Sequence, residues 1–321
     1  MFDTTNYQKA KKYWHMGKIY DWSDAHVHPM THALHYGSSI FEGIRAYRTD
    51  KGPAVFRLPE HIDRLFHSAS ALNMIIPYDK PAIVEAIIRI VKENELDSAY
   101  IRPLAFYSYG GLSLVPESCP VELVIGAWER SAYLGAQSIH GVSVYILPAP
   151  RIHPRQLDTS AKLGGLYVQS VIHSIKARAL GCEEGMFLNL EGNVAEGTGE
   201  NVFIVYGNTV KTNDASESIL EGITRTSLLD IARDIGYNTV IGRITKKEFL
   251  NAEEAFFTGT AAEVAPIVRI LDGSTAQKGT KELTIGNGRV GPITKRLMEA
   301  YQDTVRGKTK EYEKWLTFVG A

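Results

Sequence analysis

Short runs of β-branched and aromatic residues joined by tight turns constrain the fold of this 321-residue chain most strongly. Glu-Gly-Asn at 191–193 and Gly-Asn at 207–208 each separate two such runs, a pattern typical of antiparallel β-hairpins. Hairpin signals of this kind outnumber alternations of strand and helix along the sequence. The sequence therefore predicts an α+β protein with mostly antiparallel sheets and flanking helices.

The N-terminal part combines helical and extended patterns. Apolar residues recur at helical spacing over 60–74 and over 80–92, where Pro81 suits a first turn. Extended segments are expected at 41–48, 55–56, 99–108 and 121–129. We therefore predict a small N-terminal α+β domain over residues 1–130.

A small, polar and Gly-containing stretch at 131–138 suits an interdomain loop, after which residues 139–321 are expected to form a large C-terminal α+β domain. Its expected helices are 165–180, 225–235 and 294–305, and its expected strands are 142–148, 185–190, 202–206, 239–243 and 254–257.

The composition indicates a small molecule as the ligand. The formal net charge is -1 with 22% charged residues, so no strong field marks nucleic acid or an anionic membrane as a partner. No stretch approaches the ~20 apolar residues of a membrane span, and residues 1–20 lack the apolar segment of a secretory signal. Cys119 and Cys182 are expected to be reduced thiols. These features predict a cytoplasmic protein, and no metal site is expected.

Two ionisable residues stand in settings that suit covalent cofactor chemistry. Lys162 lies among small and apolar residues, which leaves room for a flat cofactor and favours a nucleophilic amine. Glu196 precedes two glycines after a turn, where a carboxylate can face a pyridine nitrogen. Alone, each has a plainer interpretation: a solvated lysine at a helix start, and a carboxylate in a glycine turn.

Anion-binding features accompany these two residues. The turn Gly222–Arg225 precedes an amphipathic helix and resembles a phosphate seat, and Gly259–Ala262 offers a second cluster of N–H donors, although ordinary helix caps look the same. Arg64 falls near the apolar face of a helix, where a phosphate would justify it, or it is a surface arginine. Arg102 lies mid-strand, where it would grip a carboxylate unless Pro103 marks an edge strand.

Taken together, these motifs resemble the branched-chain amino acid aminotransferases, class IV aminotransferases of the fold-type IV pyridoxal-phosphate enzymes. The resemblance runs from about Ala25 to about Leu297. It rests on HALHYGSSIFEGIRAY (32–47), AYIRPL (99–104), AKLGGLY (161–167), EGTGENVF (196–203), LEGITR (220–225) and GTAAEVAP (259–266).

The resemblance implies pyridoxal 5'-phosphate held as a Schiff base by the catalytic Lys162, with Glu196 facing the pyridine nitrogen. The implied cofactor-binding residues are Arg64, Lys162, Tyr167, Glu196, Leu220, Gly222, Ile223, Thr224, Gly259 and Thr260. The implied reaction is ping-pong transamination between L-leucine, L-isoleucine or L-valine and 2-oxoglutarate or branched-chain 2-oxo acids.

The family also implies substrate contacts at Tyr36, Phe41, Gly43, Arg45, Tyr100, Arg102, Tyr133, Thr260 and Ala261. Tyr36 would come from a partner subunit, which implies a homodimer, or a trimer of dimers, with active sites at the dimer interface. The partners would be small amino acids and 2-oxo acids, without nucleic acid or membrane.

Other functions of the same fold stay open at this point. They are a D-amino acid or (R)-amine transaminase, an aminodeoxychorismate lyase, and a cofactor-binding protein without catalysis. Arg45 and the Tyr36–Arg102 pair favour the branched-chain type. The loop YSYGGLS at 107–113 departs from the usual family loop and leaves the breadth of substrates open.

Overall fold

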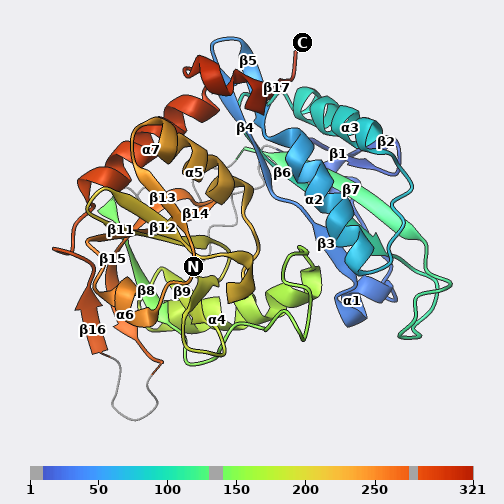
Figure 1. The fold of residues 1–321 in the computed structure, drawn as a ribbon. Helices are drawn as coiled ribbons and strands as arrows, with labels where there is room; N and C mark the ends of the chain where they lie inside the picture. Colours follow the sequence, from blue (N-terminus) through green and yellow to red (C-terminus); the bar gives the residue numbers. More distant parts are fainter. Residues whose placement is uncertain (1–9, 130–139, 275–280, 321) are drawn as a thin grey trace. The chain divides into compact units, whose positions relative to one another are not determined.

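The computed structural model describes residues 10–129, 140–274 and 281–320. Contacts divide this part of the chain into two compact units. The first comprises 10–129, 161–167 and 303–320, and the second comprises 140–160, 168–274 and 281–302. Figure 1 shows the helices and strands of both units along the chain. The α+β class is confirmed.

In the described part of the first unit, eight strands form one antiparallel sheet in the order β17-β5-β4-β6-β7-β1-β2, with β3 added on β6. The strands are β1 (Lys12–His15), β2 (Lys18–Asp21), β3 (Ser39–Phe41), β4 (Ile44–Thr49), β5 (Gly52–Phe56), β6 (Ala99–Tyr107), β7 (Val121–Trp128) and β17 (Leu316–Phe318). The strands predicted at 55–56, 99–108 and 121–129 are confirmed, whereas the strand predicted at 41–48 is interrupted at 42–43 and forms β3 and β4.

Two helices cover one face of this sheet, α2 (Leu58–Ala71) and α3 (Lys80–Glu93) (Figure 1). Both match the predicted amphipathic segments, and their apolar stripes bury residues such as Ile62 and Ile87. The Asp79 side chain caps α3 by accepting the Ala82 N–H at 2.9 Å. Shorter helical segments are α1 (His32–Tyr36), η2 (Trp22–Asp24), η4 (Gly164–Leu166) and η6 (Lys310–Trp315).

In the described part of the second unit, nine strands form a mixed sheet in the order β10-β9-β8-β15-β14-β11-β12-β13, with β16 on β15. The strands are β8 (Val142–Ile146), β9 (Glu184–Leu188), β10 (Val194–Gly197), β11 (Asn201–Tyr206), β12 (Thr209–Thr212), β13 (Asn238–Ile241), β14 (Glu254–Gly259), β15 (Glu263–Asp272) and β16 (Lys281–Thr284). Only β8–β9, β8–β15 and β12–β13 are parallel pairs among the described strands.

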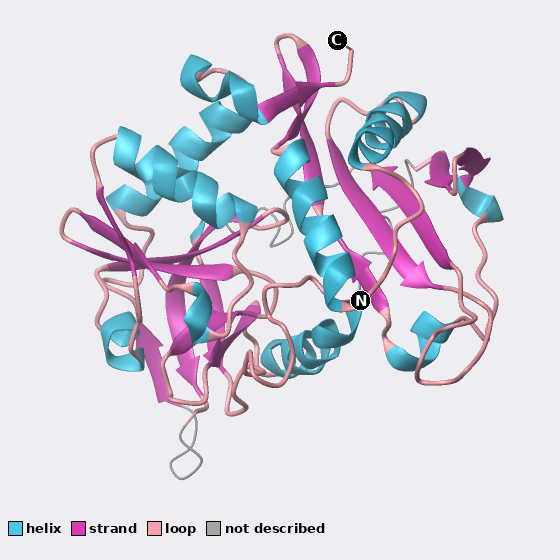
Figure 2. Cartoon of the chain, turned by 45° about the vertical axis from the view of Figure 1, so that its right-hand side comes forward, coloured by secondary structure: helices cyan, strands magenta, loops and turns pink. Residues whose placement is uncertain are grey.

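The two turn signals that the sequence placed at 191–193 and 207–208 join β9 to β10 and β11 to β12, as predicted. The helical segments are α4 (Tyr167–Ala179), α5 (Ile223–Asp234), α6 (Lys246–Leu250), α7 (Pro292–Val305) and η5 (Ala215–Glu217) (Figure 2). The three predicted helices of this part are α4, α5 and α7.

Two segments beyond residue 138 join the first unit. Leu163 forms a bridge with Ile40, and β17 pairs with β5 through Leu316 and Phe56. The first unit is therefore built from three separate segments of the chain. The predicted boundaries at 130 and 139 instead divide the chain into two continuous domains. The predicted interdomain loop at 131–138 lies outside the described residues, and the domain boundaries stay a prediction.

The remaining predictions about the chain concern cysteine and the membrane. Cys119 and Cys182 are free thiols and both are buried, as expected. Across the described ranges, no helix combines the length and the apolar character needed to cross a membrane.

The capping box of α6 gives a pH-dependent contribution to stability. Glu248 accepts hydrogen bonds from Lys211 Nζ and from the Thr245 N–H, which lower its pKa to about 2. A carboxylate with a lowered pKa stabilises the folded state above the unfolded pKa, and this contribution disappears as the pH falls from about 4.5 towards 2. Because Glu248 is partly exposed, the contribution is screened by solvent.

We expect Glu248→Gln to lower the free energy of unfolding at pH 7 by roughly 1 kcal/mol, as for other helix caps. Urea unfolding at pH 7 and at pH 3.5 measures the difference between the two proteins at each pH. The difference should be smaller at pH 3.5, and an equal difference at both pH values would contradict the assigned role of the charge.

Candidate active site

The segment that carries Lys162 is fixed on the sheet of the first unit. Its backbone N–H donates to Ser68 Oγ at 2.8 Å, and its carbonyl accepts the Phe41 N–H at 3.3 Å. A side chain on Gly164 would collide with Ser39 Oγ, because a Cβ there would lie 2.2 Å from that oxygen. Lys162 is therefore half-buried and lies before η4, outside any helix, unlike a solvated lysine at a helix start.

The Lys162 amine lies beside two aromatic rings that contact each other. Its Nζ is 2.5 Å from Tyr167 Oη, 5.0 Å from the centroid of the Phe41 ring and 4.9 Å from that of Tyr167. The two rings contact each other edge to face at 4.8 Å. This setting offers an amine next to a phenolic hydroxyl and flat apolar surfaces, which suits condensation with the carbonyl of a planar ligand.

Arg64 is held in the interior by a carboxylate. Its Nε and Nη2 donate to Glu42 at 2.6 and 2.9 Å, and His61 Nδ1 lies 2.7 Å from the same carboxylate. Glu42 is fully buried. Burial alone would raise the pKa of Glu42, but Arg64 and His61 hold it well below its usual range. Arg64 is thus a partly buried, oriented guanidinium and not a freely solvated surface arginine.

His61 completes this cluster as an imidazole in an apolar setting. Burial lowers the pKa of His61, and the positive charges of Arg64 and Lys162 act in the same direction, whereas Glu42 opposes them. The cluster therefore favours one negative and one positive charge, on Glu42 and Arg64, with His61 neutral.

Arg102 lies on β6 beside the aromatic rings. Its guanidinium carbon is 4.6 Å from the Phe41 centroid, and its Nη2 donates to Tyr100 Oη at 2.8 Å. Its Nε is buried without a hydrogen-bond partner in the described structure. A buried donor in this state favours an anionic ligand, because an oxygen acceptor would satisfy it.

Strand β6 is an interior strand, so the edge-strand interpretation of Arg102 is wrong. Pro103 lacks an N–H, and it lies where β3 ends at Phe41 and β4 begins at Ile44, opposite a break in the ladder. The proline therefore removes no hydrogen bond from an unbroken ladder.

Two further predicted residues flank Tyr100. Arg45 is its direct cross-strand partner on β4, so both side chains lie on the same face of the sheet. Gly43 faces the tyrosine hydroxyl, since a Cβ at this position would lie 2.3 Å from Tyr100 Oη. The glycine is needed because Tyr100 occupies the space of a side chain.

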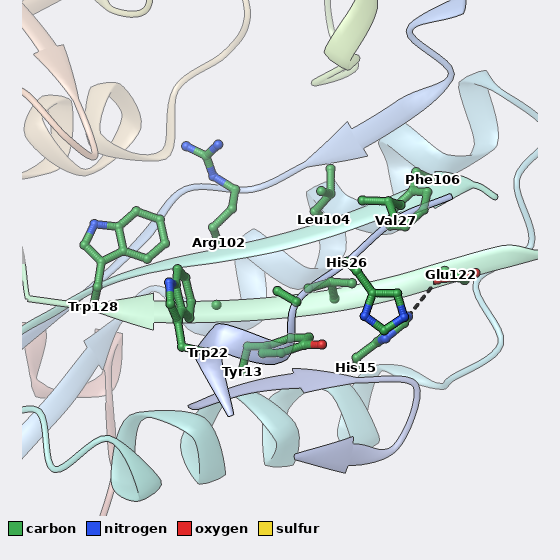
Figure 3. Close-up of a pocket in the computed structure, with 13 residues that line it drawn as sticks. Tyr13, His15, Trp22, His26, Val27, Arg102, Leu104, Phe106, Glu122 and Trp128 are labelled. Atoms are coloured by element: carbon green, nitrogen blue, oxygen red, sulfur yellow. Dashed lines mark hydrogen bonds and ion pairs between the residues drawn. The ribbon is translucent and has the colours of Figure 1, made fainter. Parts of the chain in front are cut away.

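A cavity of about 280 Å³ opens on the same face of this sheet, with Arg102 at its border (Figure 3). Its walls are mainly aromatic and aliphatic, and the His15–Glu122 pair at 2.7 Å lines it as well. The residues are Tyr13, His15, Trp22, Ala25, His26, Val27, Arg102, Leu104, Phe106, Glu122, Val124, Gly126 and Trp128. Of the predicted substrate residues that the structure describes, Arg102 alone lines it.

Two further predicted substrate residues are Tyr36 and Tyr133, and the structure describes only the first of them. Tyr36 ends α1, is 46% exposed and donates to the Leu112 carbonyl at 2.9 Å, which ties it to the divergent 107–113 loop. Tyr133 lies outside the described residues.

In the second unit, Glu196 ends up in β10 and pairs with a buried arginine. Arg151 donates to Glu196 Oε1 through Nε at 2.9 Å and lies 2.9 Å away through Nη2. The Leu220 N–H donates to Glu196 Oε2 at 3.0 Å. The carboxylate is therefore charge-compensated and held from two sides, and it is not a solvated loop residue.

The other predicted residues of this unit lie at a helix N-terminus and in a hairpin turn. Gly222 is the N-cap of α5 and has no side chain to cap the helix. The N–H groups of the first turn, which contains Ile223 and Thr224, therefore point out of the N-terminal end of α5. A Cβ on Gly222 would lie 2.1 Å from Asn201 Oδ1. Residues 259–262, including Thr260 and Ala261, form the turn between β14 and β15.

The first unit thus groups Lys162 with Phe41, Tyr167, Arg102 and Tyr100, and the second groups Glu196 with Leu220. Sequence reasoning missed Glu42, His61, Arg151 and Asn201. The available signal for Glu42 was a lone acidic residue within the apolar run 40–47, which requires a buried counter-charge.

Comparison with known proteins identifies the family of this chain. The model of the family described as amino-transferase class IV matches residues 39–270. The branched-chain-amino-acid aminotransferase of Pseudomonas aeruginosa is 44% identical over 307 residues, which cover 95% of this chain and 96% of the relative.

Solved structures agree. A branched-chain amino acid aminotransferase from T.th. with pyridoxamine 5'-phosphate has a TM-score of 0.90 at 40% identity, over 97% of this chain and 99% of the other. The same enzyme complexed with N-(5'-phosphopyridoxyl)-L-glutamate has a TM-score of 0.89 at 39% identity, with the same coverage. The chain therefore belongs to the class IV aminotransferases and, within them, to the branched-chain amino acid aminotransferase family.

Proposed function

We propose that this protein transfers amino groups between L-branched-chain amino acids and 2-oxo acids, with 2-oxoglutarate as a partner, using pyridoxal 5'-phosphate on Lys162. The observation that carries the proposal is the placement of the Lys162 amine beside Tyr167 Oη and the Phe41 ring, with the Arg102 guanidinium over the same ring. Family membership at 44% identity supports the reaction class.

The side chains of each unit fit this cofactor. In the first, Lys162 would supply the amine, Tyr167 a donor for the phenolic oxygen, and Arg64 a partly buried cation for the phosphate. In the second, the proposal assigns Glu196 to the pyridine nitrogen. The remaining phosphate ligands would be the N–H and hydroxyl groups of Ile223, Thr224, Gly259 and Thr260, with Leu220 and Gly222 shaping the site.

When bound, pyridoxal phosphate supplies a ring that draws electrons away from the substrate Cα. Lys162 would hold the cofactor through its amine, and the same amine would accept the Cα proton of the substrate. The Tyr167 hydroxyl lies within hydrogen-bonding distance of the lysine amine and would orient it for this transfer. Arg151 favours the ionised form of Glu196, and this carboxylate would face the pyridine nitrogen.

The substrate pocket must accept an aliphatic side chain in one half-reaction and a carboxylate in the other. Phe41 and Tyr100 supply apolar surface for the first, and the unsatisfied Nε of Arg102 supplies a donor for the second. The phosphopyridoxyl-glutamate complex of the T.th. relative fits this requirement. We assign Gly43, Arg45, Tyr133, Thr260 and Ala261 to the substrate as well.

The proposal includes a homodimer to which Tyr36 contributes from the partner subunit. Helix α4 supports it, because Val168, Val171, Ile172 and Ile175 expose between 57% and 63% of their surface at i, i+3, i+4 and i+7. A continuous apolar stripe of this kind is typical of a protein interface.

Lys162→Ala should lower turnover of L-leucine with 2-oxoglutarate by at least about 10²-fold, because the variant lacks the amine that transfers the proton. A coupled assay measures it, with Lys80→Ala, an exposed lysine paired with Asp63, as the control that keeps activity. Wild-type turnover of D-alanine without turnover of L-leucine would overturn the proposed substrate class.

Arg102→Leu should weaken glutamate and 2-oxoglutarate selectively, by about 10-fold to 10²-fold in kcat/KM, since one charge-assisted contact is lost. The half-reactions with L-glutamate and L-leucine are compared by cofactor absorbance. Arg48→Leu, at an exposed arginine of β4, is the matched control. Equal losses for both substrates would contradict the role of Arg102 in binding the distal carboxylate.

Ile172→Asp should convert the dimer to a monomer, because the charge would be buried in the apolar interface. Sedimentation velocity measures the mass of each species. Ile241→Asp places the same charge on another exposed isoleucine, on strand β13, and should leave the dimer intact. A monomeric wild-type protein, or a variant that stays dimeric, would refute the α4 interface.

A further inference from the structure

The turn that follows Glu196 rests on two buried glutamates of the second unit. Glu184 on β9 is 1% exposed, and Glu200 at the end of the turn is 5% exposed. The Gly199 N–H donates to Glu200 Oε2 at 3.0 Å, and the Thr198 hydroxyl donates to Glu184 Oε1. Each residue of the turn after Gly197 is therefore bonded to one of the two carboxyl groups.

The two carboxyl groups accept from consecutive residues of the turn, Thr198 and Gly199, and so lie close to each other in the interior. A hydrogen bond between two carboxyls requires one proton, because two carboxylates present only acceptors. Two anions in contact in the interior would repel each other and lose their hydration. Close approach of these two buried carboxyl groups therefore favours one proton on the pair.

The surroundings make this pair a support for the turn. Ser174 on α4 lies 2.6 Å from the Thr198 hydroxyl, which extends the network from the helix through Thr198 to Glu184. Gly197 has no room for a side chain, since a Cβ would lie 2.8 Å from Glu200 Oε2 and 2.9 Å from Phe257. The Glu200 side chain therefore lies directly against the backbone of the residue that follows Glu196.

We propose that the proton shared by Glu184 and Glu200 holds the 197–199 turn in place, so that these two glutamates are positioning residues for Glu196. The role in cofactor binding rests on the proposed function, whereas the shared proton does not depend on it.

The charges around the pair agree with a single shared proton. Arg178 on α4 attracts Glu184 at longer range, Glu196 has its own counter-charge in Arg151, and Glu183 next to β9 accepts hydrogen bonds from Ser143. Burial raises the pKa of Glu184, against the lowering effect of the Thr198 hydroxyl and the Gly185 N–H.

The sign of the pH dependence follows from this raised pKa. The folded protein keeps a proton that the unfolded chain releases above its ordinary carboxyl pKa of 4.5. Stability therefore decreases as the pH rises from about 4.5 through the raised pKa, by up to about tenfold per pH unit in the unfolding equilibrium constant.

Glu184→Gln tests the shared proton, because an amide donates permanently to Glu200. Urea unfolding of the cofactor-free wild type and variant is measured between pH 5 and pH 9. The unfolding constant of the wild type, divided by that of the variant, should rise with pH. The corresponding ratio for Glu254→Gln should not, since Glu254 is a buried carboxylate that accepts the N–H groups of Ile293 and Thr294. A flat ratio for Glu184→Gln would overturn the shared proton.

Glu184→Leu tests the positioning role, because it removes the donor while filling the space. The dissociation constant of pyridoxal phosphate should increase by about tenfold in this variant and stay within about twofold of wild type in Glu184→Gln at pH 6. Unchanged affinity in Glu184→Leu would overturn the positioning role. If the wild type fails to bind pyridoxal phosphate, both the positioning role and the proposed function are overturned. The urea unfolding profiles of wild type and Glu184→Gln test the shared proton independently of that result.

Discussion

The seating of the 161–167 segment on the first unit is the constraint on which the rest of the site depends. Ser68 Oγ and the Phe41 N–H hold both polar groups of the Lys162 backbone, so the lysine side chain has one direction in which to extend. That direction leads to the Phe41 and Tyr167 rings. Because backbone bonds and not side-chain packing fix the lysine, its amine remains able to exchange partners during the reaction.

Two of the charged residues assigned to the cofactor lie inside together with a counter-charge. Glu42 accompanies Arg64, and Arg151 accompanies Glu196. An isolated charge in such settings would lose several kcal/mol of hydration, whereas a paired one is oriented and can still attract a ligand. The Glu184–Glu200 pair would differ under the proposal above, since a proton would compensate it in place of a cation.

The local patterns predicted most of the fold. Amphipathic periodicity gave α2 and α3, and the turn signals gave the β9–β10 and β11–β12 hairpins. Lys162 and Glu196 were also accessible, through their small or glycine-rich neighbours. Arg151 was not, because its partner lies 45 residues away, and neither was the pairing of β17 with β5. Such long-range contacts leave no periodic trace in the sequence, and only the family motifs connected distant segments.

The contact between Gly43 and Tyr100 restricts how this site can evolve. A side chain at position 43 is incompatible with the tyrosine hydroxyl, whereas a smaller residue at position 100 leaves space that position 43 can fill. The two positions must therefore change in a fixed order, with Tyr100 shrinking before Gly43 enlarges, and the effects of the two changes will not be additive. Because Tyr100 also contacts Arg102, a new pocket shape reached by this route alters the anion site in the same step.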